Sequence, residues 1–114
     1  MIGEDIFVPD LAGWKVEHFS RPKGHNWIAV IPDWVCEIIS PGSARTNRMK
    51  KMRIYAQYKV SHAWLVDPTQ MMVEVYRLEA EKWAVFGVYA ESEKMRAEPF
   101  QEIEIDLSGL WLEG

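Results

Sequence analysis

Hydrophobic and polar positions along the chain predict several short strands around one helix. The segment DIFVPDLAGW, residues 5–14, is expected to form a strand. Pro9 within it favours an edge position or a bulge, because proline cannot donate a ladder hydrogen bond. The polar segment that follows, residues 15–26, is broken by proline and glycine and is expected to be a loop. The apolar run WVCEII, residues 34–39, then predicts a short buried strand.

The spacing of apolar residues becomes helical after the turn at Pro41-Gly42. The segment SARTNRMKKMRIYAQYKV, residues 43–60, predicts a helix with Ser43 as its N-cap. Residues at helical spacing form an expected apolar stripe, made of Met49, Met52, Ala56 and Val60. A second set, spaced by four residues and therefore on another common face, comprises Asn47, Lys51 and Tyr55.

The second half of the chain has the two-residue period of strands. HAWLVDP, residues 62–68, is expected to be a strand that ends in an Asp-Pro turn. Residues 72–91 predict a hairpin that turns near residues 79–81. Residues 93–107 offer one or two further short strands, and a closing helical turn is expected from Asp106.

This order of elements predicts an α/β (α+β) fold. A strand–helix–strand crossover of this length joins parallel strands, with a right-handed connection. We therefore expect a mixed β-sheet with a crossover helix on one face and a C-terminal β-meander.

Composition limits the kind of protein. The 114 residues are 48% hydrophobic and include six tryptophans, as in a packed globular chain, and we expect one domain over residues 1–114. No apolar run approaches the roughly 20 residues of a membrane span, and the first ten residues lack the basic and apolar regions of a signal peptide. The single cysteine, Cys36, excludes an internal disulfide and a multi-cysteine zinc site. We expect a buried thiol in a cytoplasmic protein without a membrane partner.

Charge is unevenly distributed along the chain. The net charge is −4, but residues 21–59 contain eight basic residues against only Asp33 and Glu37, which sums to +6. The ordinary explanation is a solvated helix face. Segregation of this kind also favours an anionic partner such as nucleic acid.

Candidate chemistry centres on a carboxylate within an apolar strand. Alternation places Glu37 on one face with Val35 and Ile39, where an ionised carboxylate is costly unless it is paired or bound to a metal. Asp10 has a similar setting, and two strands could bring it to Glu37. Two carboxylates with waters and a phosphate are a usual way to hold Mg²⁺. Lys51 could approach the same point and orient or deprotonate a water, or offset the charge on a phosphate.

Each of these residues also has an ordinary structural explanation. Asp10 is equally consistent with a turn aspartate, Glu37 with an ion pair to a helix arginine, and Lys51 with a solvated side chain. The residues alone leave these alternatives open.

Other acids and the histidines are weaker candidates. Asp33 shares the face of Glu37 by alternation but fits the start of the strand. Asp67, before a proline, fits the opening of a type I turn. The histidines His18, His25 and His62 lack helical ligand spacing, so we do not expect a zinc site.

Four motifs in order resemble the Uma2 family, also called DUF820, of the PD-(D/E)XK nuclease superfamily. They are VPDLAGW, PDWVCEIISP, a basic helix containing KMRIYAQYKV, and HAWLVDP. The resemblance covers nearly the whole chain. It implies a restriction-endonuclease-like fold and an endonuclease that hydrolyses DNA phosphodiester bonds with Mg²⁺ or Mn²⁺.

The resemblance also implies roles for individual residues. Asp10 matches the aspartate of the family's PD motif and Glu37 matches the acid of its second motif, so both would hold the metal. The superfamily's usual lysine position, two residues after the acid, is Ile39 here. Lys51 matches the lysine that has moved to the next helix in this family, and it would serve the attacking water. Basic residues of the same helix are expected DNA contacts, namely Arg45, Arg48, Lys50 and Arg53.

Two departures from the family pattern leave alternatives. Asn47 stands where such sequences often have aspartate, and family members usually have elements ahead of the PD strand. We therefore expect exposed apolar surface that a second copy covers in a homodimer. The alternatives are a catalytically inactive nuclease fold that acts as a DNA-binding or protein-interaction module, and a structural remnant that only dimerises.

Overall fold

The computed structural model describes residues 9–15, 31–40 and 45–111, with only the backbone at residues 45–47. Its elements, in chain order, are β1 (Leu11–Gly13), β2 (Trp34–Ile38), α1 (Arg45–Gln57), β3 (His62–Asp67), β4 (Met72–Glu79), β5 (Lys82–Ala90), β6 (Lys94–Met95), β7 (Ile105–Asp106) and the 3-10 helix η3 (Leu107–Gly109).

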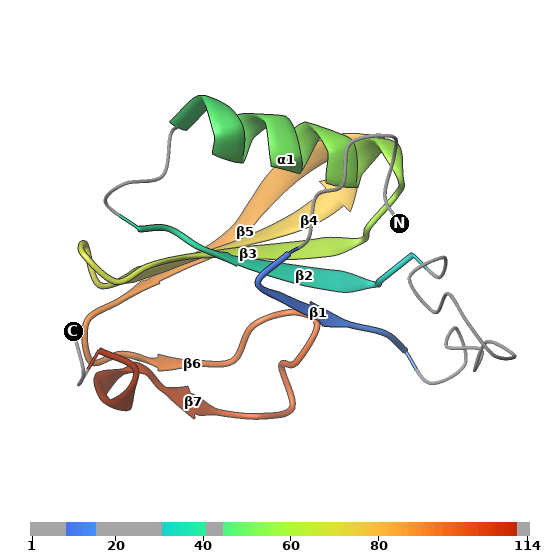
Figure 1. The fold of residues 1–114 in the computed structure, drawn as a ribbon. Coiled ribbons are helices and arrows are strands. Elements are labelled where there is room, and N and C mark those ends of the chain that lie inside the picture. Colours follow the sequence, from blue (N-terminus) through green and yellow to red (C-terminus); the bar gives the residue numbers. More distant parts are fainter. Residues whose placement is uncertain (1–8, 16–30, 41–44, 112–114) are drawn as a thin grey trace, which may run out of the picture.

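A five-stranded mixed sheet organises the molecule, with the strand order β1-β2-β3-β4-β5. Strands β2 and β3 are parallel, and the other neighbours in this sheet are antiparallel. Helix α1 links the parallel pair and covers one face, and the β6–β7 pair lies on the opposite side of the sheet (Figure 1). The predicted α+β class, the crossover helix and the meander are confirmed.

Side chains on the two faces of the sheet build two apolar clusters. The cluster beneath α1 contains Val35, Tyr55, Val60 and Ala63. The cluster on the other face contains Cys36, Trp64, Val73, Val75, Met95, Ala97 and Leu107. Cys36 is only 3% exposed, as expected for a buried thiol. Alternation along β2 therefore places Val35 and Glu37 toward the helix and Cys36 toward the second layer.

The second layer is anchored by aromatic rings. Trp34, Trp64 and Phe100 contact one another edge to face, with ring centroids 5.0–5.7 Å apart. Such contacts add to the stability gained by burial alone. They fix the segment after β6 against the central strands.

The buried face of α1 differs from the predicted stripe. Met49 is 51% exposed, so its prediction as a core residue is wrong. The cluster beneath the helix instead contains Tyr55, which is 0% exposed, with Met52 packed against it. The four-residue spacing predicts Tyr55 on the face of Lys51 and outside the apolar stripe, but its large ring packs against Val35 and Val60. The helix is also shorter than predicted, and Ser43 lies outside the described residues.

Helix α1 ends in a motif that lacks its usual glycine. Lys59 adopts a left-handed conformation with φ 63°. The amide of Lys59 donates to the carbonyl of Ala56, and the amide of Val60 donates to the carbonyl of Tyr55, both at 3.0 Å. This is the Schellman pattern, in which the residue after the left-handed one packs back on the helix. Val60 does so, at 0% exposure.

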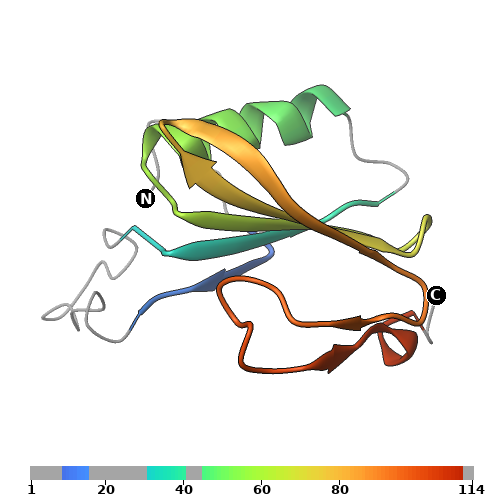
Figure 2. The same ribbon diagram turned by 180° about the vertical axis from the view of Figure 1, so that it is seen from behind.

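Strands β4 and β5 form the predicted hairpin. Its two turn residues, Ala80 and Glu81, have φ 51° and 67°, as in a two-residue type I′ turn. The register shifts between Val75 and Tyr76. Strand β5 lies at one edge of the described sheet, and Figure 2 shows it from its outer side.

The other edge of the described sheet is β1. The predicted strand over residues 5–14 is observed only as Leu11–Gly13, and residues 5–8 lie outside the described part. The edge position expected from Pro9 is confirmed. The predicted loop over residues 15–26 lies, except for Lys15, outside the described ranges.

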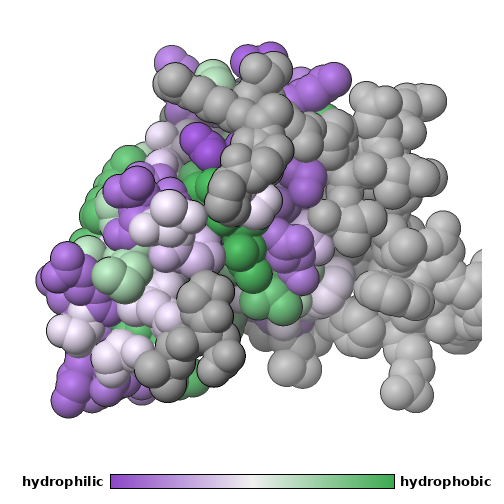
Figure 3. Space-filling view, turned by 60° about the vertical axis from the view of Figure 1, so that its left-hand side comes forward, coloured by the Kyte–Doolittle hydropathy of each residue, from purple (hydrophilic) through white to green (hydrophobic). Residues whose placement is uncertain are grey.

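The C-terminal segment matches its prediction. Two short strands pair with each other, and η3 follows with Asp106 as its N-cap, whose side chain accepts from the amide of Ser108. In the face shown in Figure 3, hydrophobic patches on the described surface are small and bordered by hydrophilic residues. Within the described ranges, no helix is long and apolar enough to cross a bilayer.

Candidate functional site

Glu37 is a buried carboxylate on the helix-covered face of the sheet. It lies in β2, one residue from the strand's C-terminal end, and is 7% exposed. Its neighbour in the parallel register is Leu65 of β3. A charged group in this setting needs strong partners, because burial removes its hydration.

Helix α1 supplies both of these partners from one side. The Lys51 Nζ lies 3.0 Å from Glu37 Oε1, and the Tyr55 hydroxyl donates to Glu37 Oε2 at 2.5 Å. The two side chains are four residues apart, so they lie one turn from each other on the helix. The ion pair is therefore with a helix lysine, not with the helix arginine considered from the sequence.

Asp10, which immediately precedes β1, reaches the same end of β2. Its Oδ2 accepts a hydrogen bond of 2.7 Å from the amide of Ile38, next to Glu37. The β1–β2 register pairs Leu11 with Cys36, so its continuation places Asp10 opposite Glu37. The Asp10 side chain is exposed, in contrast to that of Glu37. The structure thus brings Asp10, the residue before β1, to the end of the strand that carries Glu37, and it brings Lys51 of α1 to Glu37 itself.

Burial, with the nearby carboxylates as a smaller cause, raises the pKa values of Cys36 and Tyr55. Burial, followed by the charges of Asp10 and Glu37, raises the pKa of the Cys36 thiol to about 12. Burial and then the hydrogen bond to Glu37 raise the pKa of Tyr55 above its ordinary value. Tyr55 consequently remains a hydrogen-bond donor, and Cys36 remains a neutral thiol rather than a nucleophile.

The competing acids have structural roles elsewhere. Asp33 accepts from the Lys15 amide at 2.7 Å, at the start of β2, as the sequence indicated. Asp67 accepts from the Gln70 amide at 3.1 Å in the turn after β3, which confirms the predicted turn. His62, at the start of β3, contacts Glu98 at 3.0 Å. His18 and His25 lie outside the described residues.

The basic residues of α1 divide into two groups. Lys50 and Arg53 are exposed on the outer side of the helix, and Arg48 is half-buried on its inner side. The side chains of Arg45 and Asn47 lie outside the described part of the chain. Lys50 and Arg53 are therefore the described candidates that a large anionic partner could reach.

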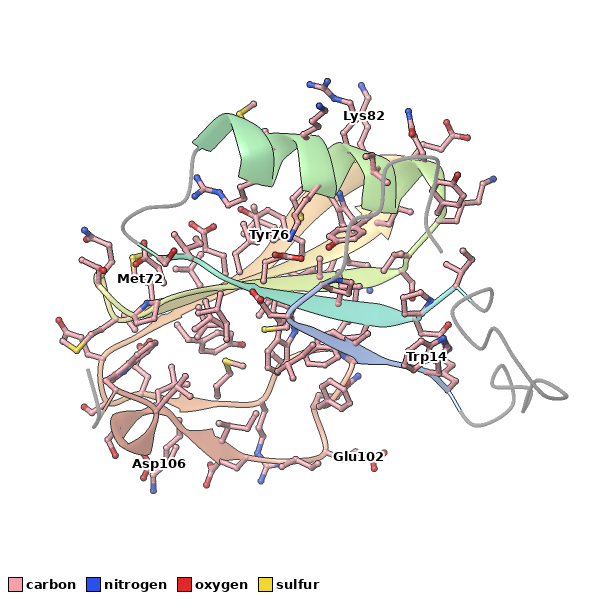
Figure 4. All side chains as sticks on the ribbon, in the orientation of Figure 1. Trp14, Met72, Tyr76, Lys82, Glu102 and Asp106 are labelled. Carbon is pink, nitrogen blue, oxygen red and sulfur yellow. The ribbon has the colours of Figure 1, made fainter. Side chains whose placement is uncertain are left out.

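Two residues near Glu37, Tyr55 and Glu74, are not predicted from the sequence as its neighbours. The four-residue spacing predicts that Tyr55 shares a helix face with Lys51, but it does not predict that Tyr55 donates to Glu37. A second carboxylate, Glu74, lies in the same row across the sheet, because Leu65 pairs with both Glu37 and Glu74. Tyr76 donates to Glu74 at 2.9 Å and projects into the layer beneath α1 (Figure 4). Burial, then its hydrogen bond to Glu74, raises the pKa of Tyr76 to about 12.

The donor set around Glu37 fits a magnesium-type cation. Among the described residues there is no group of three or more His, Cys, Asp or Glu side chains that could hold a metal ion. Mg²⁺ is usually bound by one or two carboxylates and completes its shell with water and substrate phosphates. Asp10 and Glu37 provide such a pair of oxygen donors, and each carboxylate oxygen has a second lone pair beyond the hydrogen bond described.

Comparison with known proteins places this geometry in a family. No curated protein matches the chain in sequence. The fold is similar to the crystal structure of a "putative nuclease belonging to DUF820" from Anabaena variabilis ATCC 29413, with a TM-score of 0.67 and 23% identity. The match covers 93% of this chain and 60% of that chain, so this chain spans less than two-thirds of that protein.

A family model agrees with this structural likeness. The model of Uma2, described as "Putative restriction endonuclease", matches residues 2–108. The matched range includes Asp10, Glu37 and Lys51. The chain belongs to the Uma2 family.

Proposed function

We propose that this chain is a divalent-metal-dependent endonuclease that hydrolyses DNA phosphodiester bonds. The observation that carries the proposal is the convergence of Asp10, Glu37 and Lys51 at the end of β2. Membership of a family described as "Putative restriction endonuclease" supports the same reaction class. Fold alone would not suffice, because one fold hosts many functions.

Asp10 and Glu37 would hold the metal in this proposal. When bound, Mg²⁺ or Mn²⁺ supplies positive charge that polarises a phosphate and favours loss of a proton from the attacking water. Lys51 has the position to orient that water or to stabilise negative charge that develops on the phosphate. The 3.0 Å ion pair with Glu37 Oε1 keeps the Lys51 ammonium at the carboxylate.

Cleavage of DNA with Mg²⁺ or Mn²⁺ tests this proposal. We expect the wild type to nick or linearise a supercoiled plasmid and Lys51→Ala to be slower by at least roughly a hundredfold. Lys94→Ala is the control, because Lys94 is an exposed lysine in β6, outside α1. Equal rates for Lys51→Ala and wild type would exclude a catalytic role of Lys51.

A folded wild type without cleavage would favour the alternative, an inactive module that binds DNA. The exposed basic residues Lys50 and Arg53 are the observation in favour of DNA contact. Binding without cleavage, weakened by salt, would identify that module. Absence of both activities would contradict each of these functions.

We also propose that the chain forms a homodimer through β5. Strand β5 is an edge in the described sheet, and three of its apolar residues, Val85, Phe86 and Val88, are 58%, 41% and 51% exposed. An edge strand has unpaired backbone donors and acceptors, and a second copy of the same edge can satisfy them in an antiparallel pair.

Light scattering at micromolar concentration tests the dimer. We expect a dimer for the wild type and a monomer for Val85→Lys, because the lysine would place charge in the new contact. Ile103→Lys is the matched control, since Ile103 is equally exposed at 58% but lies outside β5. A monodisperse wild-type monomer would contradict the proposal.

A further inference from the structure

Helix α1 contacts the two oxygens of Glu37 with groups that differ in charge. The Lys51 ammonium lies 3.0 Å from Oε1, whereas the neutral hydroxyl of Tyr55 donates to Oε2. The same carboxylate is therefore held at one oxygen by a cation and at the other by a neutral donor.

The two contacts also differ in freedom of movement. Tyr55 is 0% exposed and packed among Val35, Val60 and Ala63, so its rigid ring has no alternative position nearby. The Lys51 side chain is 20% exposed. Its flexible four-carbon stem can move the ammonium into solvent. Of the two partners, only Lys51 can leave without disturbing the core.

We propose that Lys51 competes with the divalent cation for Glu37 Oε1, while Tyr55 is a positioning residue that fixes Oε2. The Lys51 ammonium occupies the position next to Oε1 that a bound metal ion would take. This inference rests on the proposed function, because it assumes that Glu37 is a metal ligand.

Electrostatic repulsion determines that Lys51 lowers the affinity of the site for the cation. An ammonium and a dication repel each other strongly at distances near 4 Å, so they do not share one carboxylate oxygen. Cation binding at Oε1 therefore requires Lys51 to withdraw toward water or a substrate phosphate. A neutral residue at position 51 removes this cost, and cation affinity rises even though the catalytic group is lost.

Tyr55, in contrast, raises the affinity of the site for the cation. Its hydroxyl fixes Oε2 and thereby limits rotation of the carboxylate, so that Oε1 stays at the position that Lys51 now contacts. Without the hydroxyl, the carboxylate can rotate, and the oxygen offered to the cation is no longer fixed. Loss of such outer partners typically weakens metal binding by roughly 10- to 100-fold.

Calorimetric titration of Mn²⁺ into the DNA-free protein tests both parts. We expect the Kd to fall by at least about threefold in Lys51→Met, since a repelling charge is removed, and to rise by at least roughly tenfold in Tyr55→Phe. Lys51→Gln is a second neutral variant that keeps a polar group, and thermal melting establishes that each variant is folded.

Matched controls separate these effects from general ones. Lys50→Met removes the same charge from the neighbouring position, so it reports the effect of net charge alone. Tyr76→Phe removes a hydroxyl that contacts Glu74 and not Glu37. We expect neither control to change the Kd.

Each of the other possible outcomes contradicts one part of the proposal. Unchanged or weaker binding in both neutral Lys51 variants, with binding in the wild type, would overturn the competition and leave the nuclease proposal standing. The same tightening in Lys50→Met would also overturn it. Unchanged binding in Tyr55→Phe would overturn the positioning role. Absence of Mn²⁺ binding in the folded wild type and both Lys51 variants would overturn the metal site and this inference together.

Discussion

At the scale of single residues, the chain retains a buried carboxylate that stability alone would not favour. Glu37 is 7% exposed and depends on Lys51 and Tyr55 to replace its lost hydration. A buried ion pair is often no more stable than apolar residues of similar volume. We infer that the pair is kept for chemistry, and this has a measurable consequence.

The stability of a double variant tests this inference. Lys51→Met alone leaves Glu37 buried without its counter-ion and is expected to lower the free energy of unfolding by roughly 3 kcal/mol. Adding Glu37→Leu removes the unpaired charge, so the double variant should recover most of that loss. Urea denaturation checks the order of stabilities. A double variant less stable than Lys51→Met would show that the carboxylate itself stabilises the fold.

At the scale of elements, α1 carries a different function on each side. Its inner side contributes Tyr55 to the core and Lys51 to Glu37, whereas its outer side exposes Lys50 and Arg53. One short helix thus closes the site and presents positive charge. Because the outer residues point away from Glu37, the two sides can be altered separately.

Removal of charge from the outer side is expected to weaken DNA binding through counterion release. In Lys50→Ala/Arg53→Ala, the slope of log affinity against log salt should become shallower by about 0.9 for each DNA phosphate that the protein no longer neutralises. Fluorescence anisotropy with duplex DNA over a range of salt gives this slope. Lys82→Ala/Lys94→Ala, which removes two exposed charges outside α1, is the control. An equal change in both double variants would indicate an effect of net charge only.

The C-terminal end of α1 offers a stabilising substitution. Lys59 has φ 63°, a conformation that costs an ordinary residue roughly 1–2 kcal/mol and costs glycine little. Lys59→Gly should raise the free energy of unfolding by roughly 0.5–1 kcal/mol, after the larger entropy of glycine in the unfolded chain is subtracted. Thermal or urea denaturation measures the change. Lys50→Gly, within the helix, should instead be destabilising by about 1 kcal/mol.

At the scale of the whole molecule, helix α1, the five-stranded sheet and the β6–β7 pair form three layers. The two interfaces between these layers bury weak acids and raise their pKa values. The sheet separates a cluster beneath α1 from a cluster against β6 and β7, and each contains a weak acid with a raised pKa. These acids remain protonated in the folded protein well above neutral pH. Their effect on stability therefore appears only on the alkaline side.

We predict that stability declines as pH rises above about 9. The pKa of Cys36 is raised from 9.0 to about 12, and that of Tyr76 from 10.0 to about 12. Between the unfolded and folded pKa values, the unfolded chain has lost the proton and the folded chain still holds it. The unfolded state then binds fewer protons, so the free energy of unfolding falls with pH, by up to about 1.4 kcal/mol per unit for one fully shifted group.

Urea denaturation at pH values between about 8 and 10.5 checks this sign. Tyr76→Phe removes one of the titrating groups, so its stability should decline less steeply than that of the wild type. Constant or rising stability over this range would contradict the burial of these acids.

The sequence by itself determined the order and type of the elements and the placement of Glu37 on the same face of its strand as Val35. Those features depend on local periodicity and turn chemistry, as the alternating burial along β2 and the turn at Asp67 illustrate. The resemblance of its motifs also determined the family.

Tertiary structure alone decided which residues complete the site. The register between β1 and β2 takes Asp10 to the amide of Ile38, and the rotation of α1 turns Tyr55 inward while Met49 faces solvent. The left-handed conformation of Lys59 is equally absent from the sequence signal, which relies on glycine. These features depend on contacts between residues far apart in the chain. Local pattern leaves such contacts open, because packing selects among several faces and registers of similar apolar content.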